Sequence, residues 1–164
     1  DWSSDVCSSD LIAHLDQIVV ARRGHPLAKV RSAADLSSGE WLSRLRRDAA
    51  AEALLVCEAA MRPGRTMGEV YAAHAATFDR RGLGRHRLNA CGYSLGAVYA
   101  PSWMDWPMFY AGNPVVIEPG MVFFLHMILM DSDSGAAMTL GRTSIVGATA
   151  AEPLSRAPIE QLVC

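Results

Sequence analysis

The stretch from Met121 to Ala148, MVFFLHMILMDSDSGAAMTLGRTSIVGA, carries the clearest structural pattern in the chain. Its first ten residues are apolar except for His126, which predicts a strand buried on both faces. The following DSDSG has the composition of a hairpin loop, and a second apolar, β-branched run comes after it. We therefore predict a twisted antiparallel sheet formed mainly by residues 115–130 and 136–149.

A long amphipathic helix is expected upstream of this hairpin. Ser37 and Glu40 have the spacing of a capping box, which marks a helix start. Apolar residues then recur every three or four positions, as one face of a helix requires: Leu42, Leu45, Ala49, Ala53, Val56 and Ala60. Pro63-Gly64 should stop this helix, which we place at about residues 38–61.

A second helix should follow directly. Thr66 and Glu69 repeat the capping-box spacing, and Gly82 is placed to end the helix in the left-handed conformation. We place this helix at about residues 67–81. The predicted fold class is α+β, with two helices packed on a twisted, mainly antiparallel sheet.

The composition is that of one ordinary globular domain. The chain has 164 residues, of which 51% are hydrophobic and 20% are charged, so it is long enough to bury a core. A net charge of −2 gives no general attraction to nucleic acid. No apolar run reaches the roughly 18 residues that a membrane-spanning helix needs. We therefore expect no nucleic-acid partner and no membrane partner.

The use of cysteine points to a reducing compartment. Four cysteines occur without CxxC spacing, and a chain of this size does not need disulfides to hold its core. We therefore expect reduced thiols and a cytoplasmic location. Lys29 is the single lysine, and the other basic side chains of this class are arginines. We associate this bias with GC-rich bacterial genes.

Residues 1–11 read DWSSDVCSSDL and show no structural pattern. They have neither an apolar face nor the charged-then-apolar order of an export signal. The string resembles the conceptual translation of a sequencing-library adapter. A polar N-terminal tail is the alternative interpretation, and under both Cys7 takes no part in a mechanism.

The next segment combines a strand with a loop. Ile18-Val19-Val20 predicts a buried strand, and the breaker-rich Gly24 to Ala28 follows it. Together with Trp41, residues 12–42 resemble the effector-binding domain of LysR-type transcriptional regulators. A chance strand and loop is the alternative. The stretch is too short to be a working ligand domain, so we assign residues 12–45 to a fragment of such a domain.

The remainder of the chain presents three landmarks in order. Arg62 to Thr66 (RPGRT) joins the two predicted helices, GYSLG follows at residues 92–96, and Glu118 to Met121 (EPGM) precedes the paired strands. This order resembles the C-terminal half of the pita-bread family, which contains methionine aminopeptidase, Xaa-Pro peptidases, creatinase and ectoine hydrolase. GYSLG and the YAPSW of residues 99–103 are most similar to the ectoine hydrolase-like branch. We assign residues 46–164 to this half-domain.

The resemblance also implies a set of metal ligands that the chain lacks. Peptidases of this family hold two divalent metal ions with two aspartates, one histidine and two glutamates. The aspartates would precede the first helix, where Asp16 and Asp35 are unsuitably spaced. The histidine position is Tyr93, and the glutamate positions fall on His126 and near Gly141 to Thr143. We therefore expect no metal and no other cofactor.

Creatinase and ectoine hydrolase open C–N bonds with side chains in place of the metals. By that resemblance His126 is a candidate proton shuttle, because imidazole titrates near neutral pH, with Tyr93 and Asp105 as hydrogen-bonding partners. The alternatives are that His126 is a core histidine, that Tyr93 is a packed aromatic ring and that Asp105 is a solvated loop residue. The candidate substrate-binding residues are aromatic: Tyr99, Trp103 and Trp106.

Strand alternation makes a geometric prediction about this candidate site. His126 should share a sheet face with Phe124 and Ile128, on the side of Tyr93 and away from the helices. Leu42, Leu45 and Val56 would surround it if its role were packing.

These observations predict an inactive fragment of a hydrolase. Its parent would act on a C–N bond of a small amide, dipeptide or cyclic amidine, without metal, and would form a homodimer as the family does. One alternative is an Xaa-Pro metallopeptidase whose ligands have degenerated. The other is a non-enzymatic ligand-binding remnant of a LysR-type regulator. An upstream helix-turn-helix in the source gene would favour the regulator, and a creatinase-like N-terminal domain would favour the hydrolase.

Overall fold

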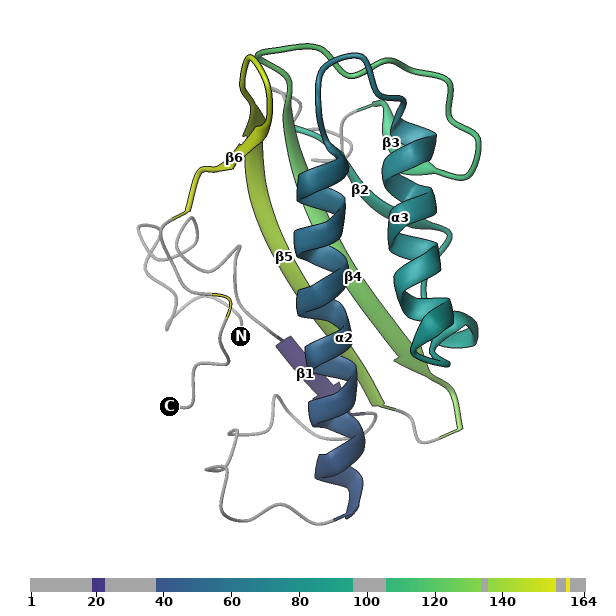
Figure 1. Ribbon diagram of the computed structural model, residues 1–164. Helices are drawn as coiled ribbons and strands as arrows, with labels where there is room; N and C mark the ends of the chain where they lie inside the picture. The colour runs from purple at the N-terminus through teal and green to yellow at the C-terminus, as the bar shows by residue number, and fades with distance from the viewer. Residues whose placement is uncertain (1–18, 23–37, 96–105, 134–135, 156–158, 160–164) are drawn as a thin grey trace, which may run out of the picture.

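A computed structural model describes residues 19–22, 38–95, 106–133, 136–155 and 159. Within these residues, two helices lie on one face of an antiparallel sheet (Figure 1). This arrangement confirms the predicted α+β fold class. The elements in chain order are β1 (Val19–Arg22), α2 (Ser38–Ala60), α3 (Met67–Arg80), the 3-10 helix η2 (Gly84–His86), β2 (Ala90–Ser94), β3 (Met108–Tyr110), β4 (Val122–Asp131), β5 (Ala136–Val146) and β6 (Ala151–Pro153).

The sheet is built around the predicted hairpin of β4 and β5. The strand order is β1-β5-β4-β2-β3, with β6 pairing to β5, and the pairings are antiparallel. β1 lies at the edge, where Val19 is opposite Thr139. The division of the chain at residue 45 remains a prediction, but a strand from the first part joins this sheet.

The prediction that the sheet begins at residue 115 was wrong, because residues 115–117 form no strand. Only an isolated bridge between Val116 and Thr66 is present. The backbone groups of this segment bond instead to the turn between the helices, because Ile117 N donates to the Arg65 carbonyl and Met67 N to the Val115 carbonyl. The segment therefore pairs with a turn rather than with a strand.

Both helices have the predicted extents, and the cap of α3 is fully formed. The Thr66 side chain accepts a hydrogen bond from Glu69 N at 3.2 Å, and Thr66 N donates to Glu69 Oε2 at 2.7 Å. Gly82 follows the helix with φ of 69°, the left-handed conformation that glycine adopts most readily. These signals were local in sequence, so they could be recognised before the fold was known.

The buried face of α2 agrees with the predicted one at Ala49 and Ala53, which are completely buried, but differs from it further along the helix. Val56 and Ala60 are half-buried, whereas Leu54, Cys57 and Met61 are completely buried. The helix is rich enough in apolar residues for two overlapping stripes to fit the helical period. The stripe with the larger side chains is the one that packs on the sheet.

β4 separates the interior from the opposite face of the sheet. Phe123, Leu125, Met127 and Leu129 point toward the helices and belong to the core. The residues between them face away, where Phe124 and Ile128 are half-buried and Met130 is exposed. Neither helix of the described part has the length and apolarity needed to cross a bilayer.

Candidate functional site

Three aromatic rings meet on the sheet face away from the helices. Tyr93 of β2 is directly opposite Phe124 of β4, with ring centroids 5.5 Å apart. The imidazole of His126 lies 5.6 Å from the Tyr93 ring and 6.1 Å from the Phe124 ring. Tyr93 and His126 are 7% and 8% exposed. The structure therefore brings together the two candidate residues on the face that alternation along β4 predicts for His126.

A bulge in β2 turns Tyr93 toward this face. In a regular strand Cys91 and Tyr93 would point the same way, but the register shifts between Ala90 and Tyr93. Cys91 consequently lies in the core, in the same cluster of buried residues as Cys57 of α2. A Cβ on Gly92 would come within 2.5 Å of the Phe124 carbonyl oxygen, so the close approach of the two strands requires glycine.

His126 is buried, and the hydrogen bonding of its imidazole ring is incomplete among the described residues. Its Nδ1 atom has no hydrogen-bond partner among the described residues. Burial lowers the pKa of His126 below its usual value, because the charged form loses its hydration. The imidazole is therefore neutral at neutral pH and has one nitrogen available for a hydrogen bond.

The other predicted site residues lie away from this group or outside the described part of the chain. Trp106 is 65% exposed, and its ring lies 6.0 Å from that of Tyr110. Asp105, Tyr99 and Trp103 lie outside the described residues. Leu42 and Leu45 lie on α2, but the structure does not describe their side chains.

A buried ion pair between α2 and β5 escaped the sequence analysis. Glu58 accepts hydrogen bonds from Arg142 at 3.0 Å and from the Ser144 hydroxyl at 2.5 Å. The side chains of Glu58 and Arg142 are only 12% and 11% exposed. The pair therefore places Arg142 on the helix side of the sheet, away from His126.

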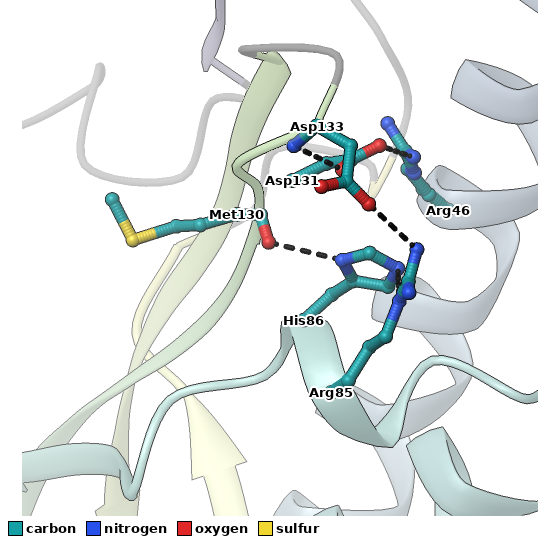
Figure 2. Close-up of polar contacts among 6 residues, drawn as sticks. All are labelled: Arg46, Arg85, His86, Met130, Asp131 and Asp133. Atoms are coloured by element: carbon teal, nitrogen blue, oxygen red, sulfur yellow. Dashed lines mark hydrogen bonds and ion pairs between the residues drawn. The ribbon is translucent and has the colours of Figure 1, made fainter.

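A second polar cluster fixes the tip of the β4–β5 hairpin to the helical layer (Figure 2). Arg46 of α2 binds Asp131, and Arg85 of η2 binds Asp133 at 3.1 Å. His86 accepts from Arg85 Nε at its Nε2 atom, so its Nδ1 donates to the Met130 carbonyl at 3.1 Å. Opposite charges are matched within the cluster, which makes it a structural clamp rather than an anion site.

The described surface also has a hollow of about 300 Å³ beside the end of β2. It contains no charged side chain among its described lining residues, and neither Tyr93 nor His126 lines it. The buried hydroxyl of Ser94 is without a partner in the described structure. The hollow is lined by Ser94, Leu95, Pro107, Gly120, Met121, Val122 and Phe123.

Comparison with known proteins identifies the family. Residues 39–149, more than half of the chain, match metallopeptidase family M24. The chain belongs to family M24. Among relatives, an uncharacterized hydrolase/peptidase y4tM of Sinorhizobium fredii is 31% identical over 105 residues, which cover 63% of this chain and 26% of that protein.

Solved structures show the M24 fold at lower sequence identity. The Xaa-Pro dipeptidase of Bacillus anthracis has a TM-score of 0.68 at 19% identity, and the match covers 79% of this chain and 34% of the dipeptidase chain. The dipeptidase PepE of Mycobacterium ulcerans has a TM-score of 0.67 at 22% identity, and the match covers 78% of this chain and 32% of the PepE chain. The M24 chain thus spans roughly a quarter to a third of the proteins that it matches.

The metal implied by the family name does not fit the described residues. They contain no group of three or more histidine, cysteine, aspartate or glutamate side chains able to hold an ion. His126 and Gly141 are directly opposite each other in the β4–β5 ladder and together offer one nitrogen donor and no oxygen side chain. Divalent metal ions in hydrolases of this kind need several such donors.

Proposed function

We propose that this M24 chain is part of a hydrolase that opens a C–N bond without a metal ion. The substrate would be a small amide, a dipeptide or a cyclic amidine such as ectoine. The observation that supports this proposal most is the buried, neutral imidazole of His126 beside Tyr93, with one nitrogen that has no hydrogen-bond partner among the described residues. Such a group can accept a proton near neutral pH, which is what a general base requires.

The proton movements assign separate roles to the residues. His126 takes a proton from water while the water oxygen bonds to the carbon of the C–N group. The protonated imidazole then returns the proton to the leaving nitrogen as the C–N bond breaks. Tyr93 orients the imidazole or the substrate, with Asp105 as a second partner. Tyr99, Trp103 and Trp106 are proposed to hold the substrate.

Two other functions compete with this proposal. Matches to proteins described as Xaa-Pro dipeptidase and prolidase favour a peptidase, here one with degenerated metal ligands. A non-enzymatic ligand-binding remnant is favoured by the LysR-like residues 12–45. The similarity of GYSLG and YAPSW to the ectoine hydrolase-like branch is our reason for placing the amide or amidine hydrolase first.

The cellular setting is proposed on the same basis. The described cysteines Cys57 and Cys91 are free and buried, which suits a reducing cytoplasm. We propose a bacterial protein that works as a homodimer on a small molecule, without nucleic-acid or membrane partners. The chain itself is proposed to be a chimera, with adapter-like residues 1–11 and a LysR-like fragment before the M24 part, and to be inactive alone.

The test is turnover by the protein that the source gene encodes. Long sequencing reads across residues 11–12 and 40–50 establish that gene, and its product is assayed with ectoine, creatine and an Xaa-Pro dipeptide. Turnover that survives a chelator supports the proposal. Turnover that requires manganese or cobalt supports the metallopeptidase, and binding without turnover supports the ligand-binding protein.

A further inference from the structure

We infer that His74 makes α3 an acid-released helix, which leaves the sheet when the imidazole is protonated while the β4–β5 hairpin stays folded. The inference does not rest on the proposed function. It is carried by three features of the structure: the complete burial of the His74 ring, the charged groups around this ring, and the position of α3 at one side of the sheet.

His74 lies on the buried face of α3 and is itself completely buried. The centroids of the Tyr71 and Phe78 rings are 5.5 Å and 4.9 Å from the centroid of its imidazole. Neither imidazole nitrogen has a hydrogen-bond partner among the described residues. An imidazolium at this position would lose its hydration without gaining acceptors for its two N–H groups. Protonation therefore favours any state of the chain in which the imidazole reaches water.

The charges near His74 disfavour its protonation. Arg87, which follows η2, and His126 of β4 oppose a further positive charge, and Asp79 of α3 favours it to a smaller extent. Asp79 is itself bound to the Arg87 guanidinium at 3.3 Å. Burial first, and then the Arg87 charge, lower the pKa of His74 from 6.5 to about 4. The helix is therefore held fully above pH 6.5 and less firmly as the pH falls toward 4.

The elements packed against α3 offer no other counter-charge to an imidazolium. These elements are α2, β2, β3 and η2, and among their described side chains only those of α2 include carboxylates. Each of these carboxylates contacts an arginine: Asp48 contacts Arg47, Glu52 contacts Arg80 and Arg81, and Glu58 contacts Arg142. The other titratable groups described on these elements are arginines, thiols, phenols and the His86 imidazole, none of which is negative at pH 7 or below.

The position of α3 lets it leave without the hairpin (Figure 1). Its contacts to the sheet are with β2 and with β3, the last strand in the sheet order, whereas α2 contacts β4, β5 and β6. The hairpin is also tied to α2 by the pairs Glu58–Arg142 and Arg46–Asp131, which do not involve α3. Packed units of this kind open separately in native proteins. The release of α3 uncovers β2, the strand that carries Tyr93.

Hydrogen–deuterium exchange of the complete chain, resolved by peptide mass spectrometry, tests the inference. Rates are measured between pH 7 and pH 4 and divided by the intrinsic exchange rate at each pH, so that they report opening alone. We expect the opening constant of residues 67–80 to rise about 20-fold from pH 7 to pH 5, because the pKa of His74 is lowered from 6.5 to about 4. These residues should lose protection at a higher pH than residues 122–146. Loss of protection by both segments in a single step would overturn the inference.

A matched pair of variants assigns the effect to one histidine. In His74→Leu, the opening constant of α3 should change by about threefold or less over the same pH range. His126→Gln removes the other histidine that is buried among the described residues, and the 20-fold rise, about the same as in the unmodified chain, should remain. A full rise in His74→Leu would contradict the inference. Where the leucine variant does not fold, the order in which the two segments of the unmodified chain lose protection decides the question alone.

Discussion

His126 lies directly opposite Gly141 in the β4–β5 ladder, on the side of the sheet away from the helices, and its Nδ1 has no partner within the described part of the chain. By the resemblance stated above, His126 stands where the family has one glutamate, and Gly141 lies in the stretch where it has another. By that resemblance, a neutral imidazole stands in place of one oxygen ligand, and the stretch from Gly141 to Thr143 offers no carboxylate in place of the other. This exchange is the structural basis for proposing hydrolysis without a metal.

The first prediction concerns metal content. The chain, purified without chelator and dialysed against buffer, should retain well below one equivalent of manganese, cobalt or zinc, because the described residues offer no cluster of donors. Elemental analysis by mass spectrometry measures this directly. Stoichiometric metal that survives dialysis would contradict the account.

The second prediction concerns stability in mild acid. His74 is completely buried between the rings of Tyr71 and Phe78, and burial lowers its pKa from 6.5 to about 4. The unfolded chain therefore binds more protons than the folded chain between these values, so stability falls as the pH drops below about 6.5. From pH 7 to pH 5 this group alone should remove about 2 kcal/mol of unfolding free energy.

Urea denaturation at a series of pH values checks that expectation. Replacing His74 by leucine removes the titrating group, and neither ring nitrogen has a partner to lose among the described residues. The variant should therefore show a shallower dependence on pH, with the His126 contribution remaining, since its pKa is also lowered. An unchanged slope in His74→Leu would show that His74 is not responsible.

The third prediction concerns the buried pair of Glu58 and Arg142. Glu58→Ala leaves the Arg142 guanidinium buried without its carboxylate, which should cost about 3 kcal/mol or more of stability. The double variant Glu58→Leu with Arg142→Leu buries no charge and should lose much less. A double variant whose loss of stability equals the sum of the losses of Glu58→Leu and Arg142→Leu, each measured alone, would mean that the pair is not coupled.

The fourth prediction concerns the cap of α3. Thr66→Ala removes the hydroxyl that accepts from Glu69 N, which should cost about 1 kcal/mol. Thr66→Ser keeps the hydroxyl and should restore most of that stability. Denaturation midpoints of the two variants provide the comparison, and equal midpoints would exclude the cap as a source of stability.

The parts of the fold that could be predicted are those that depend on patterns of neighbouring residues in the sequence. The hairpin of β4 and β5 follows from the apolar run around His126, and α3 follows from Thr66, Glu69 and Gly82. The bulge that turns Tyr93 outward could not be seen, because it depends on how β2 meets β3 and β4. Without it, simple alternation would have placed Tyr93 on the same face as Cys91.

Long-range pairing limited the prediction of the site in a similar way. Glu58 and Arg142 are 84 positions apart, so no local period links them. No local pattern singles out His74, and its complete burial depends on packing against neighbouring elements. His126 could be singled out because it is the one polar residue in an apolar run, and its neighbour Gly141 only through the register of the hairpin.

The central claim is that the His126 imidazole, not a metal ion, moves the proton. The most direct measurement is the turnover rate of the full-length gene product, with chelator present, as the unmodified protein and as His126→Gln. We expect a loss of about 100-fold or more in the variant, with Thr139→Val, on the same strand and face but outside Gly141 to Thr143, close to the unmodified rate. A rate unchanged in His126→Gln, or one restored only by added metal, would contradict it.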